Sequence, residues 1–295
     1  MIDSRIQTLI SVCETKNYTK TASLLHLTQP AVSQQIKSLE KELNIKIFNR
    51  SANQLQLTQE GMIVLKYAKR IKTLYASIVS AIEDEKKNLK SLIVGVTPSA
   101  ESNIISEVLA KYASEKGNIH IRIISDTIKN LYDKLKTYEI DIAVIEGSIV
   151  DNNFNSILLD TDYLALAVSN DNPLSKKTMV SLADLKKQNL ILRLPGSGTR
   201  SLFESHLKSH NENIHSFNVT LEVDNIAIIK DLVQHNFGVS ILAKSVCENE
   251  VKKGKFKLLP VENLSMIREV SLFYHKDFSH DDILNDITTI YRMLK

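Results

Sequence analysis

The side chains best suited to recognise another molecule lie on one stripe of a segment near the N-terminus. The segment LTQPAVSQQIKSLEKEL, residues 27–43, carries amide and hydroxyl groups suited to the base edges of DNA, followed by lysines suited to its phosphates. In helical projection these polar positions share one side: Gln29, Pro30, Ser33, Gln34, Lys37 and Lys41. Taken alone, the stripe fits the solvated face of a surface helix equally well.

The other side of this segment predicts a helix that packs. Apolar residues recur at helical spacing, namely Val32, Ile36, Leu39 and Leu43. Thr28 is placed to cap the helix start, Pro30 suits its first turn, and Asn44 is able to end it in a left-handed conformation. An earlier helix over residues 19–25 ends in the short turn LHLT. This arrangement predicts a helix-turn-helix whose second helix enters the major groove of DNA.

The residues after this helix predict a wing. KIF is expected to form a short strand, NRSANQ a polar turn and LQL a second strand. Arg50 then lies at the start of the turn, where it reaches a phosphate or the minor groove. Because the three elements follow one another in the order of a winged DNA-binding module, they favour DNA recognition over a merely solvated face.

Charge is distributed unevenly along the 295 residues. Residues 1–90 hold 14 Lys and Arg against 8 Asp and Glu, whereas the remainder holds 23 against 26. The first part therefore carries +6 and the rest −3, which indicates a polyanion-binding module joined to an ordinary soluble domain.

The segment TASLLHLTQPAVSQQIKSLEKELNIKIFNR, followed by LQLTQEG, resembles the LysR-type transcriptional regulators. These are bacterial helix-turn-helix proteins with an effector-sensing domain, and the resemblance covers the whole chain in order and spacing. The residues that it assigns to the DNA interface are Thr19, Gln29, Pro30, Ser33, Gln34, Lys37, Arg50 and Asn53. Family members often have a second wing arginine where this chain has Asn53, which predicts a weaker salt dependence of DNA binding.

A long helical pattern follows, from residue 58 to about residue 90. Its apolar residues recur about every 3.5 positions, at Val64, Tyr67, Ala68, Ile71, Leu74, Tyr75, Ile78, Ala81 and Ile82. This spacing predicts pairing with a second copy, and packing onto the chain's own first domain also fits it. In the resembled family this is the linker helix of dimers that commonly form tetramers. We therefore expect a homodimer or homotetramer on a roughly two-fold symmetric site in double-stranded DNA.

From residue 92 onward, β-branched runs alternate with amphipathic helices. SLIVGVT, IHIRIIS and IDIAVIEG are expected strands, with helices over 104–112 and 131–135 between them, and this alternation predicts βαβ units and a parallel sheet. Further strands are expected at YLALAVS, LILRL, NVTLEV, GVSILA and VSLFYH, and further helices near 200–210, 226–235 and 281–294. LVQHNFGVSIL has Asn236 where the family usually has Gly, and Asn tolerates the same left-handed conformation.

The resemblance implies two α/β lobes, like a type 2 periplasmic binding protein, with crossover strands near residues 162–167 and 264–272. We expect a multidomain α plus α/β chain: a winged helix-turn-helix domain (1–58), a linker and dimerisation helix (59–90) and an effector-binding domain (91–295). Lobe 1 would hold about 91–162 and 268–295, and lobe 2 about 163–267.

Two helix starts, one in each expected lobe, favour an anion in the cleft. VGVTPSAES places Thr97, Ser99 and Ala100 after a strand, and LPGSGTRSLFE places Ser197, Thr199 and Arg200 at a second helix start. Ordinary helix caps explain either segment taken alone. Glu146, Gly147 and residues 222–225 are expected to line the same cleft. The predicted effector-binding residues are therefore Thr97, Ser99, Ala100, Glu146, Ser197, Thr199 and Arg200.

The resulting hypothesis is a DNA-binding regulator controlled by a small anionic metabolite, with RNA polymerase as a further candidate partner. An enzyme with an α/β core is the alternative, but P-loop, G-x-S-x-G and H-E-x-x-H motifs are absent from the sequence. We therefore expect no catalytic residues, no metal and no cofactor. MIDSRIQTLI lacks the features of a signal peptide, which disfavours a solute-binding module and predicts a cytoplasmic protein without a membrane partner. Cys13 and Cys247 are expected to be free thiols.

Overall fold

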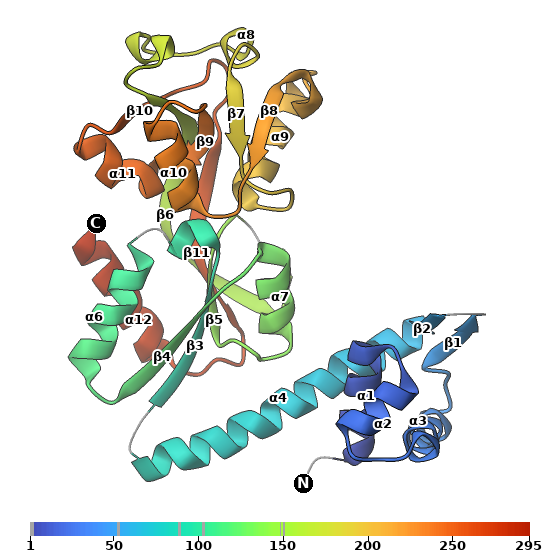
Figure 1. The fold of residues 1–295 in the computed structure, drawn as a ribbon. Helices are drawn as coiled ribbons and strands as arrows, with labels where there is room; N and C mark the ends of the chain where they lie inside the picture. The colour runs from blue at the N-terminus through green and yellow to red at the C-terminus, as the bar shows by residue number, and fades with distance from the viewer. Residues whose placement is uncertain (1–2, 52–53, 88–89, 102–103, 148, 150) are drawn as a thin grey trace. The chain divides into compact units, whose positions relative to one another are not determined.

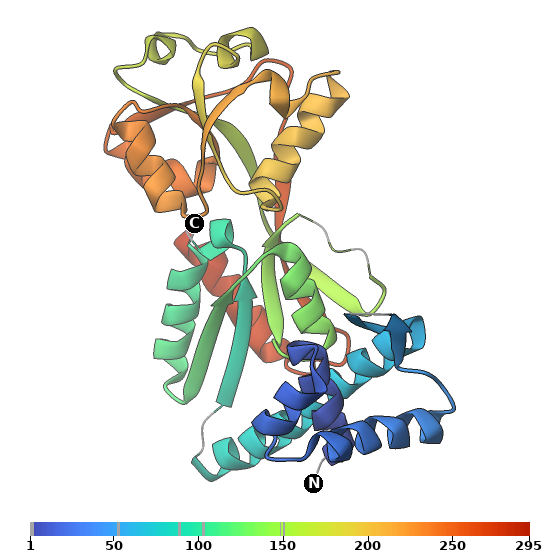
Figure 2. The same ribbon diagram turned by 45° about the vertical axis from the view of Figure 1, so that its right-hand side comes forward.

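The computed structural model describes residues 3–51, 54–87, 90–101, 104–147, 149 and 151–295. The chain divides into two compact units. The first is Met1–Ser91 together with Lys136–Glu139, and the second is Leu92–Leu135 together with Ile140–Lys295. Figures 1 and 2 show the helices and strands of each unit.

The first unit begins with a small helical bundle and a hairpin. The helices are α1 (Ser4–Thr15), α2 (Tyr18–Leu24) and α3 (Gln29–Leu43), and the antiparallel strands are β1 (Phe48–Ser51) and β2 (Gln54–Leu57). Their shared core contains Leu9 and Val12 of α1 and the predicted buried residues Val32, Ile36 and Leu39 of α3. The expected winged helix-turn-helix is confirmed.

The ends of α3 follow the predicted capping. Thr28 Oγ1 accepts a hydrogen bond from Ala31 N at 3.4 Å, and Asn44 has a φ of 52°, in the left-handed region. Leu43 is the exception on the apolar side, because its side chain is 46% exposed. It is the last residue of the helix, beyond the point where Leu39 closes the core.

The first wing strand begins at Phe48, later than the expected Lys46. The Ile47 N–H donates to Glu40 Oε1 (2.9 Å), so only its carbonyl, which accepts from Thr58 N (3.0 Å), continues the hairpin bonding. Arg50 consequently lies within β1, opposite Leu55, rather than in the turn. Asn53 lies outside the described residues.

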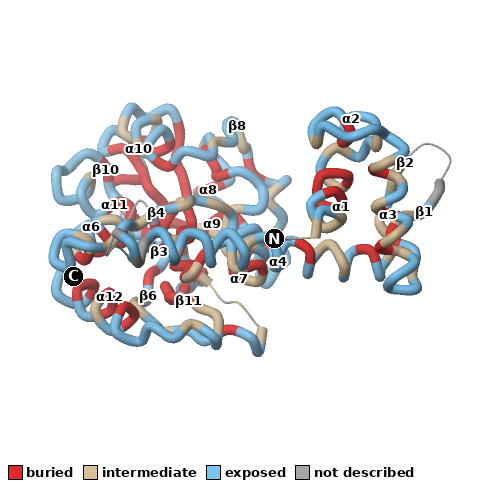
Figure 3. Tube along the Cα trace, turned by 90° about the horizontal axis from the view of Figure 1, so that it is seen from below, coloured by how far each residue is buried: buried red, intermediate tan, exposed pale blue. Residues whose placement is uncertain are grey.

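Helix α4 (Gln59–Lys87) has two different halves. Near its start, Gly61 is required by packing, since a Cβ there would lie 2.1 Å from the carbonyl oxygen of Ile47. Val64 and Ala68 then pack into the helical core. Further along, the apolar side chains are exposed: Ile71, Leu74, Tyr75, Ile78 and Ile82 are each 41–57% accessible (Figure 3).

The second unit contains two lobes. In the first, β3 (Lys90–Val96), β4 (Ile119–Ser125) and β5 (Ile142–Glu146) form a sheet with α5 (Pro98–Glu101), α6 (Ile105–Lys116), α7 (Ile128–Lys136) and α12 (Asp281–Leu294) around it. Ile142 and Val144 face the core shared with α6 and α12, whereas Ala143 and Ile145 face the core shared with α7. Helices thus cover both faces of the sheet, as Figure 1 shows.

The second lobe surrounds one larger core. Its strands are β7 (Asn189–Leu192), β8 (Asn218–Glu222), β9 (Ser240–Ala243) and β10 (Phe256–Leu259). Its helices are α8 (Leu182–Leu185), α9 (Gly198–Ser209), α10 (Ile226–Gln234) and α11 (Lys244–Lys252), with short 3₁₀ turns at Pro173–Lys176 and Ile214–Ser216. Asn236, after α10, has a φ of 58°, so the expected left-handed conformation is confirmed.

Two long strands pass between the lobes. β6 (Phe154–Ser169) pairs with β11 (Ile267–His275) in the first lobe, and its second half pairs with β9 and β10 in the second. The expectation of a parallel sheet is correct for β3 with β5 and for β7 with β8, but β6, β9, β10 and β11 pair antiparallel. The first half of β6, β10 and α11 were not expected from the sequence.

Candidate functional sites

The first candidate site is an open groove between α3 and the wing. It has a volume of about 1020 Å³ and is bounded by α3, by Tyr18 of α2 and by Phe48, Asn49 and Leu55 of the wing. Glu40 fixes the angle between helix and wing, since its carboxylate accepts from Ile47 N and pairs with Lys46 Nζ at 3.1 Å. Tyr18 and Phe48 meet edge to face, with ring centroids 6.3 Å apart.

The predicted stripe of α3 borders this groove. Gln29, Ser33, Lys37 and Lys41 line it, and Gln29, Lys37 and Lys41 are exposed. The predicted residues Thr19, Pro30 and Gln34 are exposed but do not line the groove. Since Glu40 is engaged by Lys46, the groove keeps an excess of positive charge from Lys37 and Lys41. This surface combines directional polar groups with cations, as DNA recognition requires.

The second candidate site is a cavity of about 700 Å³ between the two lobes of the second unit. From the first lobe it is lined by Thr97, Ser99, Glu146 and residues 125–128, and from the second by residues 193–198 and 224–226. Arg268 of β11 completes the wall. The lobes approach closely at Gly198, where a Cβ would lie 3.3 Å from Ile128 Cδ1 and 3.7 Å from the carbonyl oxygen of Glu146.

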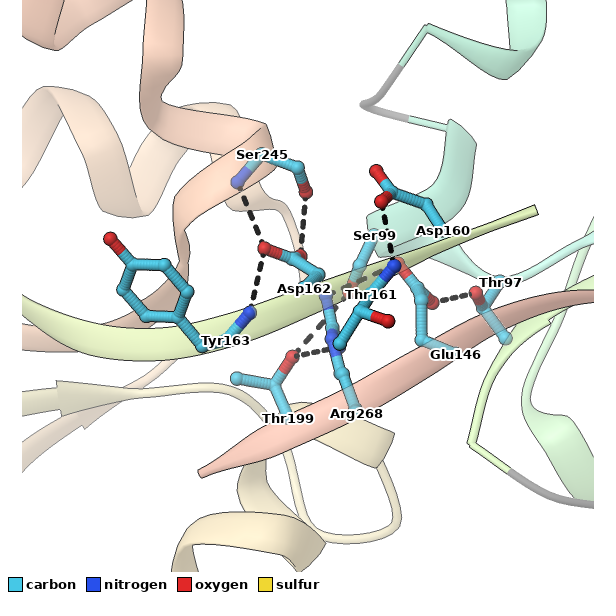
Figure 4. A network of polar contacts seen from close by, with 10 residues as sticks. All are labelled: Thr97, Ser99, Glu146, Asp160, Thr161, Asp162, Tyr163, Thr199, Ser245 and Arg268. Carbon is cyan, nitrogen blue, oxygen red and sulfur yellow. Dashed lines mark hydrogen bonds and ion pairs between the residues drawn. The ribbon is translucent and has the colours of Figure 1, made fainter. Parts of the chain in front are cut away.

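Arg268 is the centre of a buried polar cluster that joins both lobes (Figure 4). Its Nη2 donates to Glu146 Oε1 (3.2 Å) and Asp162 Oδ2 (3.3 Å), and its Nη1 donates to Thr199 Oγ1 (3.3 Å). Thr97 donates to Glu146, and Ser245 Oγ donates to Asp162 Oδ2 at 2.7 Å. Burial raises the pKa of Glu146, and the Arg268 charge and the Thr97 hydroxyl only partly oppose this effect.

Arg193 lies at the second-lobe side of the cavity. It is 3% exposed, and its Nη2 donates to Asp224 Oδ1 at 2.9 Å, but the Asp224 side chain is itself 71% exposed. Among the described residues no acceptor reaches Nε of Arg193 or Nε of Arg268. A buried donor without an acceptor costs about 1–3 kcal/mol, so both groups favour a bound molecule that supplies one.

Two helices of the second lobe begin beside Arg193. Ser197 caps α9, accepting from Arg200 N at 3.2 Å, and Asn225 caps α10, accepting from Ala227 N at 2.8 Å. Ser197, Gly198, Asn225 and Ile226 all line the cavity. The partial positive charges of these helix starts add to the charge of Arg193.

Arg200 does not line this cavity, in contrast to its predicted place. Its guanidinium is buried and donates to Glu204 (2.7 Å), to the Arg193 carbonyl (3.1 Å) and to Glu222. Burial lowers the pKa of Arg200, but these carboxylates more than compensate and raise it. Because α9 turns this side chain toward β8, its charge is neutralised inside the lobe. Arg193, seven residues earlier and missed in the sequence, takes the position at the cavity.

The other predicted effector residues divide between wall and interior. Thr97, Ser99, Glu146 and Ser197 line the cavity. Thr199 lies behind it, bonded to Arg268 and 3.4 Å from Ser99 Oγ, and Ala100 is buried in the first-lobe core. The helix that starts after Thr97 is only the four-residue turn α5, so its dipole adds little.

The described residues contain no group of three or more His, Cys, Asp or Glu side chains able to hold a metal ion, and no helix with the length and apolar content of a membrane span. Cys13 and Cys247 are free thiols, as expected, and burial raises their pKa values to about 11 and about 12. Neither thiol is a nucleophile at neutral pH.

Comparison with known families decides the classification. A model described as bacterial regulatory helix-turn-helix protein, lysR family, matches residues 4–62, and one described as LysR substrate binding domain matches residues 87–287. The chain belongs to the LysR family of transcriptional regulators. The family resemblance drawn from the sequence is thereby confirmed, and the family is one of regulators rather than enzymes.

Individual relatives and solved structures align with all or most of this LysR-family chain. A probable RuBisCO transcriptional regulator of Phaeodactylum tricornutum is 28% identical over 277 residues, which cover 92% of this chain and 90% of the relative. Full-length CbnR, solved in complex with its target DNA, has a TM-score of 0.68 at 17% identity and full coverage of both chains. The Synechocystis CcmR regulatory domain, solved with 2-PG, has a TM-score of 0.61 at 17% identity and covers 69% of this chain and 98% of that domain.

Proposed function

We propose that this LysR-family regulator binds a roughly two-fold symmetric DNA site through α3 and the wing, and that a small anion between the lobes changes that binding. The observation that carries the proposal is the division of α3 into two sides. Val32, Ile36 and Leu39 are buried, whereas the polar stripe opposite them is accessible and borders a basic groove. The similar CbnR is solved in complex with its target DNA, which supports the same use of this module.

Within the DNA interface the residues divide by chemistry. Gln29, Ser33 and Gln34 would contact base edges, with Pro30 and Thr19 beside them, because amide and hydroxyl groups form directional bonds. Lys37 and Lys41 would contact phosphates, and Arg50 of the wing would reach a phosphate or the minor groove. This proposal implies a cytoplasmic protein that works beside the chromosome, with RNA polymerase as a candidate partner.

The exposed half of α4 supports assembly into a dimer or tetramer. Ile71, Leu74, Ile78 and Ile82 form an accessible apolar stripe at heptad-like spacing, which a second α4 would cover. A dimer presents two copies of α3, which is why we expect a two-fold symmetric DNA site. The corresponding domain division is 1–58, 59–90 and 91–295.

The proposed effector site is the cavity between the lobes. Arg193 supplies a positive charge and N–H donors, the starts of α9 and α10 supply backbone N–H groups, and Ser197 supplies an O–H donor. Together these groups form a subsite for an oxyanion. The similar CcmR domain is solved with 2-PG, which supports a small-molecule ligand in this domain. An effector that contacts both lobes would favour one lobe arrangement and, through the dimer, one geometry of the two α3 helices.

Selection of bound fragments from fragmented genomic DNA tests the DNA-binding half of the proposal. We expect enrichment of sites with two related half-sites, because two copies of α3 must lie in successive major grooves. Recovery of unrelated sequences, bound with an affinity that varies only with salt concentration, would contradict the proposed sequence-specific binding. Phosphate contacts alone carry no sequence information. A mobility-shift assay on the enriched site then provides the reference affinity for the variants below.

A further inference from the structure

The charges around the interlobe cavity are balanced differently at its two ends. At the end formed by β11, Arg268 has two buried carboxylate partners, Glu146 and Asp162, whose side chains are only 3–4% exposed. At the second-lobe end, Arg193 has one ion-pair partner, Asp224, which is largely in water. The positive charge of Arg268 is therefore already neutralised within the protein, whereas that of Arg193 is available to a ligand.

The remaining acidic residue on the wall does not change this balance. Asp126 accepts from Lys134 Nζ at 2.5 Å, from Asn130 Nδ2 at 2.7 Å and from Thr127 N at 2.8 Å. These bonds lower its pKa against the effect of burial, which raises it. Asp126 is thus an ionised group with its own cation, and it offers a ligand neither a positive charge nor a free donor.

Within the described part of the chain, the buried Nε–H of each arginine nevertheless has no acceptor. An acceptor at Arg193 is best supplied by an anion, because charge and hydrogen bond then act together. An acceptor at Arg268 must be different. A second anion there would lie beside Asp162 and Glu146 without a spare positive charge, an ammonium group would offer no acceptor, and an apolar group would leave the N–H unpaired.

We propose that the effector carries a single anionic group, held by Arg193, and an uncharged oxygen acceptor, a hydroxyl or carbonyl, held by Arg268. This inference rests on the proposed effector site and specifies its ligand class: small hydroxy or oxo acids, or phosphate esters with a free hydroxyl. The hydroxyl of Ser99 at the same end suits an uncharged oxygen as well. The cavity of about 700 Å³ has room for such a molecule and is much larger than one inorganic anion needs.

Two matched ligand series test this assignment by calorimetry and thermal shift on the full chain. The carboxylate series is butyrate, 4-hydroxybutyrate and succinate, and the phosphate series is ethyl phosphate, 2-hydroxyethyl phosphate and phosphoglycolate. Each series keeps one anionic head and changes the far group from methyl to hydroxyl to a second anion. We expect the hydroxyl member of at least one series to bind roughly tenfold tighter than its two companions, the effect of one added hydrogen bond to a charged donor.

The two series also separate a carboxylate head from a phosphate head, because only the matching head should bind well. Equal binding of methyl and hydroxyl members, or tighter binding of the dianion, would overturn the inference. In either case the proposed effector site would still stand if Arg193→Gln abolished binding of the ligands. If no member binds the wild-type protein while DNA binding is intact, or if Arg193→Gln leaves the binding unchanged, the proposed effector site fails and this inference fails with it.

A charge-removing variant sharpens the test. Asp162→Asn retains shape but removes one of the two negative charges beside Arg268, so preference should shift from the hydroxyl member toward the dianion by roughly tenfold. Glu146→Gln, measured at a pH where Glu146 is ionised in the folded protein, should shift it in the same direction and replaces Asp162→Asn if that variant fails to fold. Circular dichroism and DNA binding verify the fold. An unchanged preference in a folded variant would contradict the charge argument.

Discussion

The α3 groove is built mainly from exposed polar side chains, whereas the interlobe cavity is built around buried charged ones. The groove takes most of its polar groups from one helix, and Gln29, Lys37 and Lys41 are exposed. The cavity collects groups from both lobes and from a crossover strand, and Arg193, Arg268 and Glu146 are at most 7% exposed. Water and salt screen the first set, whereas protein partners must balance each charge in the second.

A substitution in the α3 groove should therefore change DNA recognition without changing stability, whereas a substitution in the interlobe cavity should change both. A polar side chain on the accessible side of α3 has few partners inside the protein, so its loss should affect only DNA binding. Arg268 is bonded to Glu146, Asp162 and Thr199 at once, so its loss leaves buried groups unpaired. Three variants, in decreasing order of expected effect, test whether the two sites differ in this way.

Arg268→Met should have the largest effect, because it leaves two buried carboxylates without their cation. Removing one partner of a buried ion pair typically costs about 3–5 kcal/mol of unfolding free energy. Urea denaturation, followed by circular dichroism, measures this change. The matched control is Arg122→Met on β4, an exposed arginine, which should change stability by less than about 0.5 kcal/mol. Equal destabilisation by both variants would remove the distinction between buried and exposed charge.

The double variant Ser33→Ala/Gln34→Ala should affect recognition without affecting stability. We expect a loss of about 2 kcal/mol, roughly thirtyfold, in affinity for the selected DNA site, with unchanged binding to unrelated DNA. Mobility-shift titrations on both DNAs measure the ratio, and urea denaturation should give an unchanged midpoint.

Lys41→Gln is the matched control for the groove. As a phosphate contact, Lys41 should contribute equally to all sequences, so the variant should weaken both DNAs alike and reduce the salt slope by about one. If the double variant behaved in the same way as Lys41→Gln, its residues would contact only the backbone.

The two sites also differ in how much the sequence predicts. Helix α3 has its cap, its period and its exposed stripe within seventeen consecutive letters, residues 27–43, so local rules suffice. The wing was also expected, but its first strand was placed two residues early, because the bond from Ile47 N to the Glu40 carboxylate is tertiary. Strand β10 and helix α11 were missed, and both belong to the second lobe, where β9 and β10 pair antiparallel with β6.

The cavity was predicted only in outline, because its geometry also depends on contacts between residues far apart in the sequence. GSGTR correctly indicated a helix start at the cavity, but the direction of the Arg200 side chain depends on Glu204 and Glu222, which only the folded lobe brings together. Arg193 and Arg268 stand in strand-like segments, LILRL and MIREV, with no local motif to mark them. A lone arginine in an apolar strand is nonetheless a usable signal, since burial of such a charge requires a partner.

Glu146→Gln should give the smallest effect, and its sign depends on pH. Because the pKa of Glu146 is raised in the folded protein, the folded state holds a proton at pH values where the unfolded state, with an ordinary pKa near 4.5, has lost it. The free energy of unfolding therefore falls as pH rises above about 4.5, by at most about 1.4 kcal/mol per pH unit, until the folded state also ionises. Gln removes this proton uptake, so the variant should lose less stability than the parent as pH rises.

Urea denaturation at several pH values between about 5 and 8 measures the divergence between Glu146→Gln and the parent. Glu107→Gln, at an exposed position on α6, should give a curve parallel to the parent. Parallel curves for all three proteins would mean that Glu146 is hydrated in solution, and the cavity would then resemble the groove.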